Sequence, residues 1–114
     1  MRAYLPLTLE QLAEFEAAGV VPASVDKILA EDESEEAEYA ALMTAADASA
    51  RLQSEMRAGS GRRVVLAADV DELAGAVPKK RWAAVLVDTE DDADPDDDLA
   101  WYAIQEISEL LAGR

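Results

Sequence analysis

Apolar and polar side chains alternate over the first residues of the chain, with the two-residue period of a β-strand. We expect a short strand over residues 1–5. Thr8 and Gln11 then have the spacing of a capping box, and Gly19 is a residue type that tolerates a positive φ angle. Because helix signals stand at both ends of this segment, its apolar spacing predicts a helix over residues 8–18.

A longer helical pattern follows a segment with weaker signals. Residues 20–30 hold only one turn of apolar spacing, and we expect a short helix there. Asp32 and Glu35 repeat the capping-box spacing, and neither glycine nor proline interrupts the chain until Gly59. The sequence therefore predicts a long helix from residue 32. Its inward stripe includes Tyr39, Leu42, Ala45, Ala46, Ser49 and Gln53.

Residues 62–68 and 82–87 are rich in β-branched and apolar residues and show almost no alternation. This pattern is typical of strands that are covered on both faces. About a dozen residues join the two runs, which is just enough for a parallel crossover with a helical turn over residues 70–76.

The last segment predicts a terminal helix, because Asp94 and Pro95 have the order of a cap and a first-turn proline. We expect this helix to end near Leu111. All elements together describe one α/β domain over residues 1–114, in the order strand, helix, helix, strand, short helix, strand, helix. The expected sheet is small, mostly parallel and of about three strands, and helices cover it.

The composition narrows the chemistry that such a domain can perform. The 114 residues include 25 Asp and Glu against 10 Lys and Arg, a formal net charge of −15, and neither His nor Cys. A histidine base and thiolate ligands or nucleophiles are therefore excluded. The acidity disfavours direct binding to nucleic acid, and no apolar run reaches membrane-helix length. We expect a cytoplasmic protein without a cofactor.

Half of the basic residues precede the two expected interior strands: Arg62, Arg63, Lys79, Lys80 and Arg81. Acidic residues follow the same strands: Asp69, Asp71, Asp88, Glu90 and Asp91. Parallel strands would collect the bases at one edge of the sheet and the acids at the other. Antiparallel strands would instead place a base beside an acid at each end. The strand direction thus decides whether the molecule has one coherent electronegative surface.

On the parallel interpretation, Thr8, Asp69 and Asp88 approach one another at the carboxyl edge of the sheet, where ligands bind in open α/β folds. Asp69 and Asp88 are the candidate metal ligands, because paired carboxylates can hold Mg²⁺ and present it to a phosphate. A divalent-cation-dependent phosphoryl-transfer or hydrolase-like enzyme is therefore one hypothesis. Against it, no basic residue lies near that edge in sequence, and no glycine loop cradles a phosphate.

Residues 88–98 hold eight of the 25 acids, and we call them the acidic segment. Acids at every second position suggest a calcium loop, but neither the register from Asp92 nor that from Asp94 supplies the glycine and glutamate of a helix–loop–helix site. Solvated charge at a helix start is one explanation. The other is recognition of a partner, for which the candidate residues are Asp92, Asp94, Asp96, Asp97 and Asp98.

Trp101 lies outside the two stripes that the expected terminal helix would bury. It either covers the edge of the core or anchors a partner or a second copy of the chain, because exposed tryptophan is favoured at interfaces. These features favour a non-enzymatic interaction or accessory protein with a protein partner, and a basic partner would complement its charge. The alternative is a nucleic-acid mimic that occupies the basic surface of a DNA-binding protein.

Four segments carry a resemblance: residues 2–6, 38–41, 64–70 and 101–106. They resemble an uncharacterised family of short acidic actinobacterial proteins, a domain of unknown function. The resemblance covers nearly the whole chain and implies a bacterial, cytoplasmic origin. It implies no activity, substrate or catalytic residue.

Overall fold

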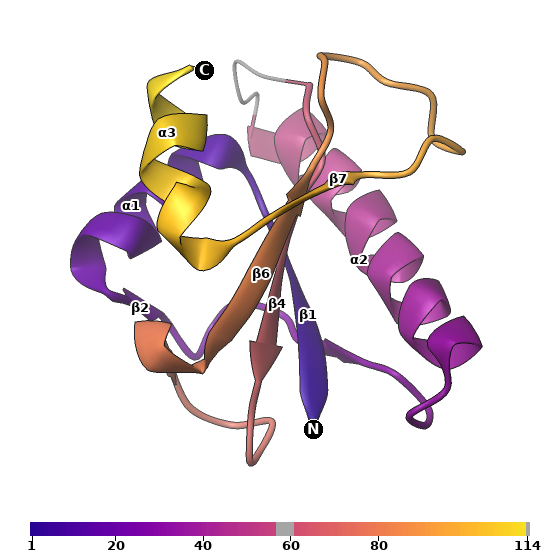
Figure 1. Cartoon of the computed structure of the whole chain (residues 1–114), viewed down its shortest axis with the longest axis vertical. Helices are drawn as coiled ribbons and strands as arrows, with labels where there is room; N and C mark the ends of the chain where they lie inside the picture. The colour runs from indigo at the N-terminus through magenta and orange to yellow at the C-terminus, as the bar shows by residue number, and fades with distance from the viewer. Residues whose placement is uncertain (57–60, 114) are drawn as a thin grey trace.

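The computed structural model describes residues 1–56 and 61–113, and its main feature is an antiparallel sheet with helices on both faces (Figure 1). The strand order of this sheet is β3-β1-β4-β6-β7. These strands are β1 (Arg2–Leu7), β3 (Ile28–Leu29), β4 (Val64–Asp69), β6 (Trp82–Val87) and β7 (Ala100–Tyr102). A second, two-stranded sheet pairs β2 (Val20–Val21) with β5 (Val77–Pro78).

Three α-helices enclose the main sheet in the described part of the chain: α1 (Leu9–Ala18), α2 (Glu35–Met56) and α3 (Ile107–Ala112). Short 3₁₀ turns precede β6 and α3. Figure 1 views the sheet nearly edge-on, with α2 on one side and α1 and α3 on the other. None of the helices described is long and apolar enough to cross a membrane.

The expected parallel sheet of about three strands is wrong. β4 pairs with β1 and with β6, and both pairings are antiparallel, with Val64 opposite Leu7 and opposite Val87. The connection between β4 and β6 explains the direction. It contains no crossover helix, because Val77 is buried and pairs with Val21, so the chain turns back instead of crossing the sheet.

The central strands β1 and β4 are buried on both faces, as their apolar runs predicted. On one face, Leu5 and Leu66 belong to the large apolar cluster under α1 and α3. On the other face, Tyr4 and Val65 lie in a smaller cluster under α2. The helix meets this face with small buried side chains, Ala41, Ala45 and Ala46, which allow close approach.

The first strand is longer than its alternation predicted. It continues through Pro6 to Leu7, with Pro6 opposite Val65. Proline is tolerated there because β3 pairs only with Ala3 and Tyr4. On the β3 side of β1, no described strand therefore lies beside Pro6 to need the missing N–H group.

The helix signals near the N-terminus are confirmed. The Gln11 N–H donates to the Thr8 hydroxyl oxygen at 3.1 Å, and the Thr8 N–H donates to the Gln11 side chain at 3.0 Å. Gly19 ends α1 with a φ of 76°. The long helix is also confirmed, but its cap is Ser34, whose hydroxyl accepts from the Ala37 N–H at 3.1 Å. Asp32 lies two residues before this cap, and its carboxylate accepts from the Ser34 N–H at 2.8 Å.

Two predicted helical segments are strands or turns. Residues 20–30 contain β2 and β3, which pair with β5 and β1, where a short helix was expected. The predicted turn over residues 70–76 is an irregular loop without helix. β2 and β3 pair with strands far away in sequence, and in the loop the Val70 N–H donates to the Met1 carbonyl. A local pattern does not reveal such partners.

The terminal helix is much shorter than predicted. Asp94 caps a turn, since its carboxylate accepts from the Asp96 N–H at 2.9 Å and its carbonyl accepts from the Asp97 N–H at 2.9 Å. The chain then enters β7, and Trp101 lies opposite Leu86 of β6. Only residues 107–112 form α3. The apolar run that suggested a helix face is therefore used as an added strand.

A buried serine connects α2 with two strands at one end of the sheet. Ser49 has no exposed surface. Its hydroxyl donates to the Leu7 carbonyl at 2.7 Å and accepts from the Val64 N–H at 2.8 Å. Gln53, one turn later, donates to the Arg62 carbonyl. These bonds satisfy backbone groups where the β1–β4 ladder ends, so the polar members of the α2 stripe align the helix on the sheet.

We expect Ser49→Ala to lower the free energy of unfolding by about 1–3 kcal/mol, because a buried carbonyl and a buried N–H would lose their partner. Urea denaturation followed by circular dichroism measures this change. Ser54→Ala, at an exposed position of the same helix, is the control and should change stability by less than about 0.5 kcal/mol. Equal effects of the two variants would contradict the role given to Ser49.

Candidate interaction surface around the acidic segment and Trp101

A buried ion pair organises the acidic segment. The Arg63 and Asp88 side chains are only 5% and 1% exposed. The guanidinium donates from Nε to Oδ2 and from an NH2 group to Oδ1 of Asp88, both at 2.8 Å, in a bidentate arrangement. The Arg63 N–H also donates to Oδ2 at 2.8 Å. The pair follows from topology, because Val64 lies opposite Val87 in antiparallel strands, so the residue before Val64 is the neighbour of the residue after Val87.

Arg63 also binds the loop that follows Asp88. Its guanidinium donates to the Pro95 carbonyl at 3.0 Å and to the Asp97 carbonyl at 2.8 Å. The hydrogen bonds with Asp88 raise the pKa of Arg63 above its ordinary value, so the group stays charged at any physiological pH. One cation thus fixes both ends of the acidic segment through Asp88 at its start and backbone carbonyls near its end.

Within the acidic segment, the Asp88 carboxylate binds this internal cation, whereas the later part of the segment meets it through backbone carbonyls. The five aspartates singled out in the sequence are all exposed: Asp92, Asp94, Asp96, Asp97 and Asp98. The Asp98 carboxylate accepts a hydrogen bond from the Tyr39 hydroxyl at 2.9 Å. Beyond Asp88, the segment therefore contacts Arg63 through its backbone, while these five aspartates are exposed. Its link to Tyr39 attaches it to α2.

Trp101 is 63% exposed although it belongs to a strand. It lies opposite Leu86, which packs against the cluster under α2, so Trp101 is on the same face of the sheet as that helix. α2 packs mainly on β1, β3 and β4, and it covers β6 and β7 less. We call Trp101, Tyr39 and the exposed aspartates of the acidic segment the Trp101 surface.

The structure separates the two proposed metal ligands. Asp69 follows the last core residue of β4 and pairs with Arg2 at 2.9 Å, whereas Asp88 lies at the other end of the sheet with Arg63. Thr8 lies at the Asp88 end, where its hydroxyl caps α1. The expected pocket of Thr8, Asp69 and Asp88 is therefore not formed. The described residues contain no group of three or more Asp or Glu side chains placed to hold a metal ion.

The expected division into a basic edge and an acidic edge is wrong as well. Arg81 pairs with Asp71 at 2.9 Å, and Arg62 lies 3.6 Å from Asp91. Ion pairs of this kind stand at both ends of the sheet, because antiparallel strands bring the residue before one strand next to the residue after its neighbour.

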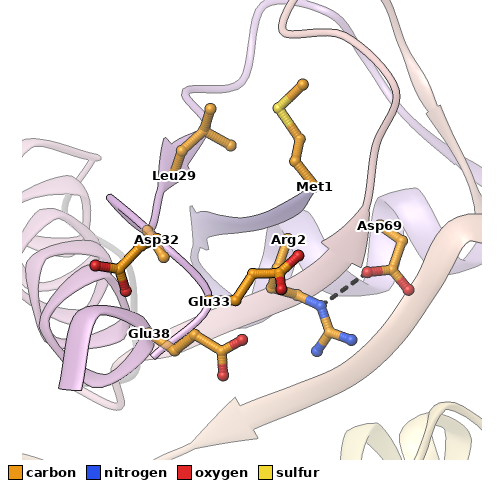
Figure 2. Close-up of a pocket in the computed structure, with 8 residues that line it drawn as sticks. Met1, Arg2, Leu29, Asp32, Glu33, Glu38 and Asp69 are labelled. Carbon is orange, nitrogen blue, oxygen red and sulfur yellow. Dashed lines mark hydrogen bonds and ion pairs between the residues drawn. The ribbon is translucent and has the colours of Figure 1, made fainter. Parts of the chain in front are cut away.

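The sequence did not reveal a hollow beside the start of β1 (Figure 2). Its volume is about 590 Å³, and its lining includes Met1, Leu29, Ala30, Asp32, Glu33 and Glu38. Arg2 reaches into the hollow and pairs there with Asp69, as Figure 2 shows. The hollow could receive a cationic group, but its own arginine already neutralises part of its charge.

Comparison with known proteins identifies the family of the chain. A model of DUF6912, a family of unknown function, matches residues 1–111, so the chain belongs to this family. The resemblance to an uncharacterised family is thereby confirmed. No curated protein and no solved structure matches the chain. The family assigns no activity to any residue.

We expect Asp88→Asn to reduce the free energy of unfolding by about 3–5 kcal/mol, because Arg63 would remain buried without its counter-charge. Denaturant unfolding measures the change. The control is Asp69→Asn, which removes an ion pair whose side chains are 39% and 58% exposed and should cost less than about 1 kcal/mol. Similar losses from both variants would contradict a special role for the buried pair.

The Tyr39–Asp98 bond predicts a pH response of the acidic segment. The hydrogen bond to the Asp98 carboxylate, followed by the charge of that group, raises the pKa of the Tyr39 phenol. The contact is thus present at neutral pH and is lost as the pH rises through this raised pKa. Asp98→Asn should lower the pKa of Tyr39 toward its ordinary value in a titration followed by NMR. Asp92→Asn should leave it unchanged, and an equal decrease in both variants would argue against this bond.

Proposed function

We propose that this DUF6912 protein is a non-enzymatic binding module for a basic protein in the cytoplasm, and that it binds through the Trp101 surface. The observation that carries the proposal is the 63% exposure of Trp101, three residues after the end of the acidic segment. Tryptophan contributes more to interfaces than most residues when a partner removes it from water. Here it stands on a strand that is paired with β6, so little conformational entropy is lost when a partner binds.

The charge of the molecule supports a basic partner. The formal net charge is −15, and the exposed aspartates of the acidic segment lie next to Trp101 in the chain. Opposite charge on a partner accelerates association and discriminates against acidic competitors. Solubility alone would account for dispersed acidic residues. The exposed tryptophan three residues after the acidic segment is a separate observation, and this residue type is enriched at interfaces.

The two rival functions are less well supported. A nucleic-acid mimic needs a continuous row of negative charge, and the ion pairs of Arg2, Arg62 and Arg81 interrupt the acidic surface at both ends of the sheet. The phosphoryl-transfer hypothesis needed Asp69 and Asp88 side by side. We therefore favour a localised contact in which one aromatic anchor is combined with neighbouring carboxylates.

Affinity capture with three immobilised forms tests this proposal: the wild type, Trp101→Ala and Leu73→Ala. Leu73 is the matched control because it is 55% exposed, apolar and outside the Trp101 surface. We expect wild type and Leu73→Ala to retain the same basic protein from a lysate of the source organism at low salt. Trp101→Ala should bind that protein, once purified, at least about tenfold more weakly by calorimetry.

The salt dependence and the variants together decide the outcome. Binding through the Trp101 surface should weaken as salt screens the carboxylates, yet it should stay sensitive to Trp101 at each salt concentration. Equal capture by all three forms would mean that only the net charge attracts proteins, and the proposal would then be rejected.

A further inference from the structure

The outer edge of β7 has no strand beside it in the described part of the chain. β7 is the last strand in the sheet order, and its residues are paired only with β6, with Tyr102 opposite Val85 and Ala100 opposite Val87. No other backbone hydrogen bond joins Ala100, Trp101 or Tyr102 to a described segment. In Figure 1, β7 lies in front of β6. An open strand edge offers N–H and C=O groups to an extended chain.

The two faces of β7 offer different side-chain contacts. Trp101 is on the α2 face, three residues after the end of the acidic segment. Tyr102 is on the opposite face and lines a hollow of about 270 Å³ together with Glu106, Glu109 and Leu110 of the following turn and α3, as well as Arg62 and Gly113. Successive residues of a strand point to opposite faces, so a strand added to β7 would address both surfaces in turn.

We infer that the partner contributes an extended basic segment that pairs with the outer edge of β7 as an additional strand, an inference that rests on the proposed function. Main-chain hydrogen bonds would supply affinity, and alternate side chains would supply specificity. A cationic side chain on one face packs on the Trp101 ring by a cation–π contact. A cationic side chain on the other face reaches Glu106 and Glu109 at the hollow.

Charge complementarity selects this occupant over a second copy of the chain. Two copies that paired through β7 would each carry a formal net charge of −15. Each acidic segment, which only Leu99 separates from β7, would then border an interface with a chain of the same sign of charge. Like charges brought together at an interface are unfavourable, whereas a basic segment neutralises the same groups.

The test uses the full chain, labelled for NMR, and a short synthetic peptide in which pairs of arginines alternate with pairs of valines, so that arginine occurs on both faces of the added strand. A second peptide has the same side chains and is N-methylated at every residue, which keeps the charge but removes the backbone donors. We expect the first peptide to shift the amide resonances of Ala100, Trp101 and Tyr102 and to slow the exchange of the outward-facing amides. The N-methylated peptide should bind at least about tenfold more weakly, since it forms no main-chain donor bonds.

Variants and sedimentation distinguish three negative outcomes: binding without strand addition, binding outside the Trp101 surface, and occupation of the edge by a second copy. Trp101→Ala should weaken binding of the first peptide about tenfold, and Leu73→Ala should leave it unchanged. If both peptides bind equally well and still depend on Trp101, strand addition is rejected while the proposed function stands. If neither variant changes peptide binding, the Trp101 surface is not the binding site and both ideas are rejected. If the protein alone sediments as a dimer and Trp101→Ala as a monomer, a second copy occupies the edge, and the inference is overturned.

Discussion

The bidentate pair of Arg63 and Asp88 is the constraint on which the rest of this structure depends. Two charges taken almost completely out of water are tolerated only where hydrogen bonds satisfy both groups, and here the carboxylate receives three donors within 2.8 Å. The pair joins the start of β4 to the end of β6 and so reinforces their antiparallel register. Because the same guanidinium also binds the Pro95 and Asp97 carbonyls, it directs the chain back toward the sheet, where β7 can form.

The two ends of the main sheet are built differently. At the Arg63 end, polar groups are buried and paired, and Ser49 connects α2 to the backbone of β1 and β4. At the Asp69 end, the ion pair with Arg2 is exposed and borders an open hollow. Exposed pairs contribute little to stability, so we attribute the positioning of the acidic segment and Trp101 to the buried end. The surface proposed for binding thus lies at the end of the sheet where the polar groups are buried and paired.

The acidic segment acquires a different meaning in three dimensions from the one its spacing suggested. Alternating aspartates suggested a cation loop, but the cation that the segment surrounds is the Arg63 guanidinium, and backbone carbonyls contact it. The Asp88 carboxylate is buried against the same guanidinium, whereas the five later aspartates are exposed, and Tyr39 binds Asp98 among them. This arrangement turns a run of like charges, which would repel one another in an unfolded chain, into a fixed acidic border beside an aromatic side chain.

The sequence by itself determined the elements whose signals are local. The capping box of Thr8, the glycine after α1, the uninterrupted α2 and the two-sided burial of β4 all depend on residues within a few positions of one another. The pattern also singled out Trp101, because it lies outside the two stripes that the expected terminal helix would bury. Only the tertiary structure decided that β2, β3 and β7 are strands, because two or three residues form a strand only where a distant partner accepts them. It also decided that β4 and β6 are antiparallel, which places Asp88 on Arg63 and far from Asp69, since strand direction depends on the path of the connecting chain and not on the strands themselves.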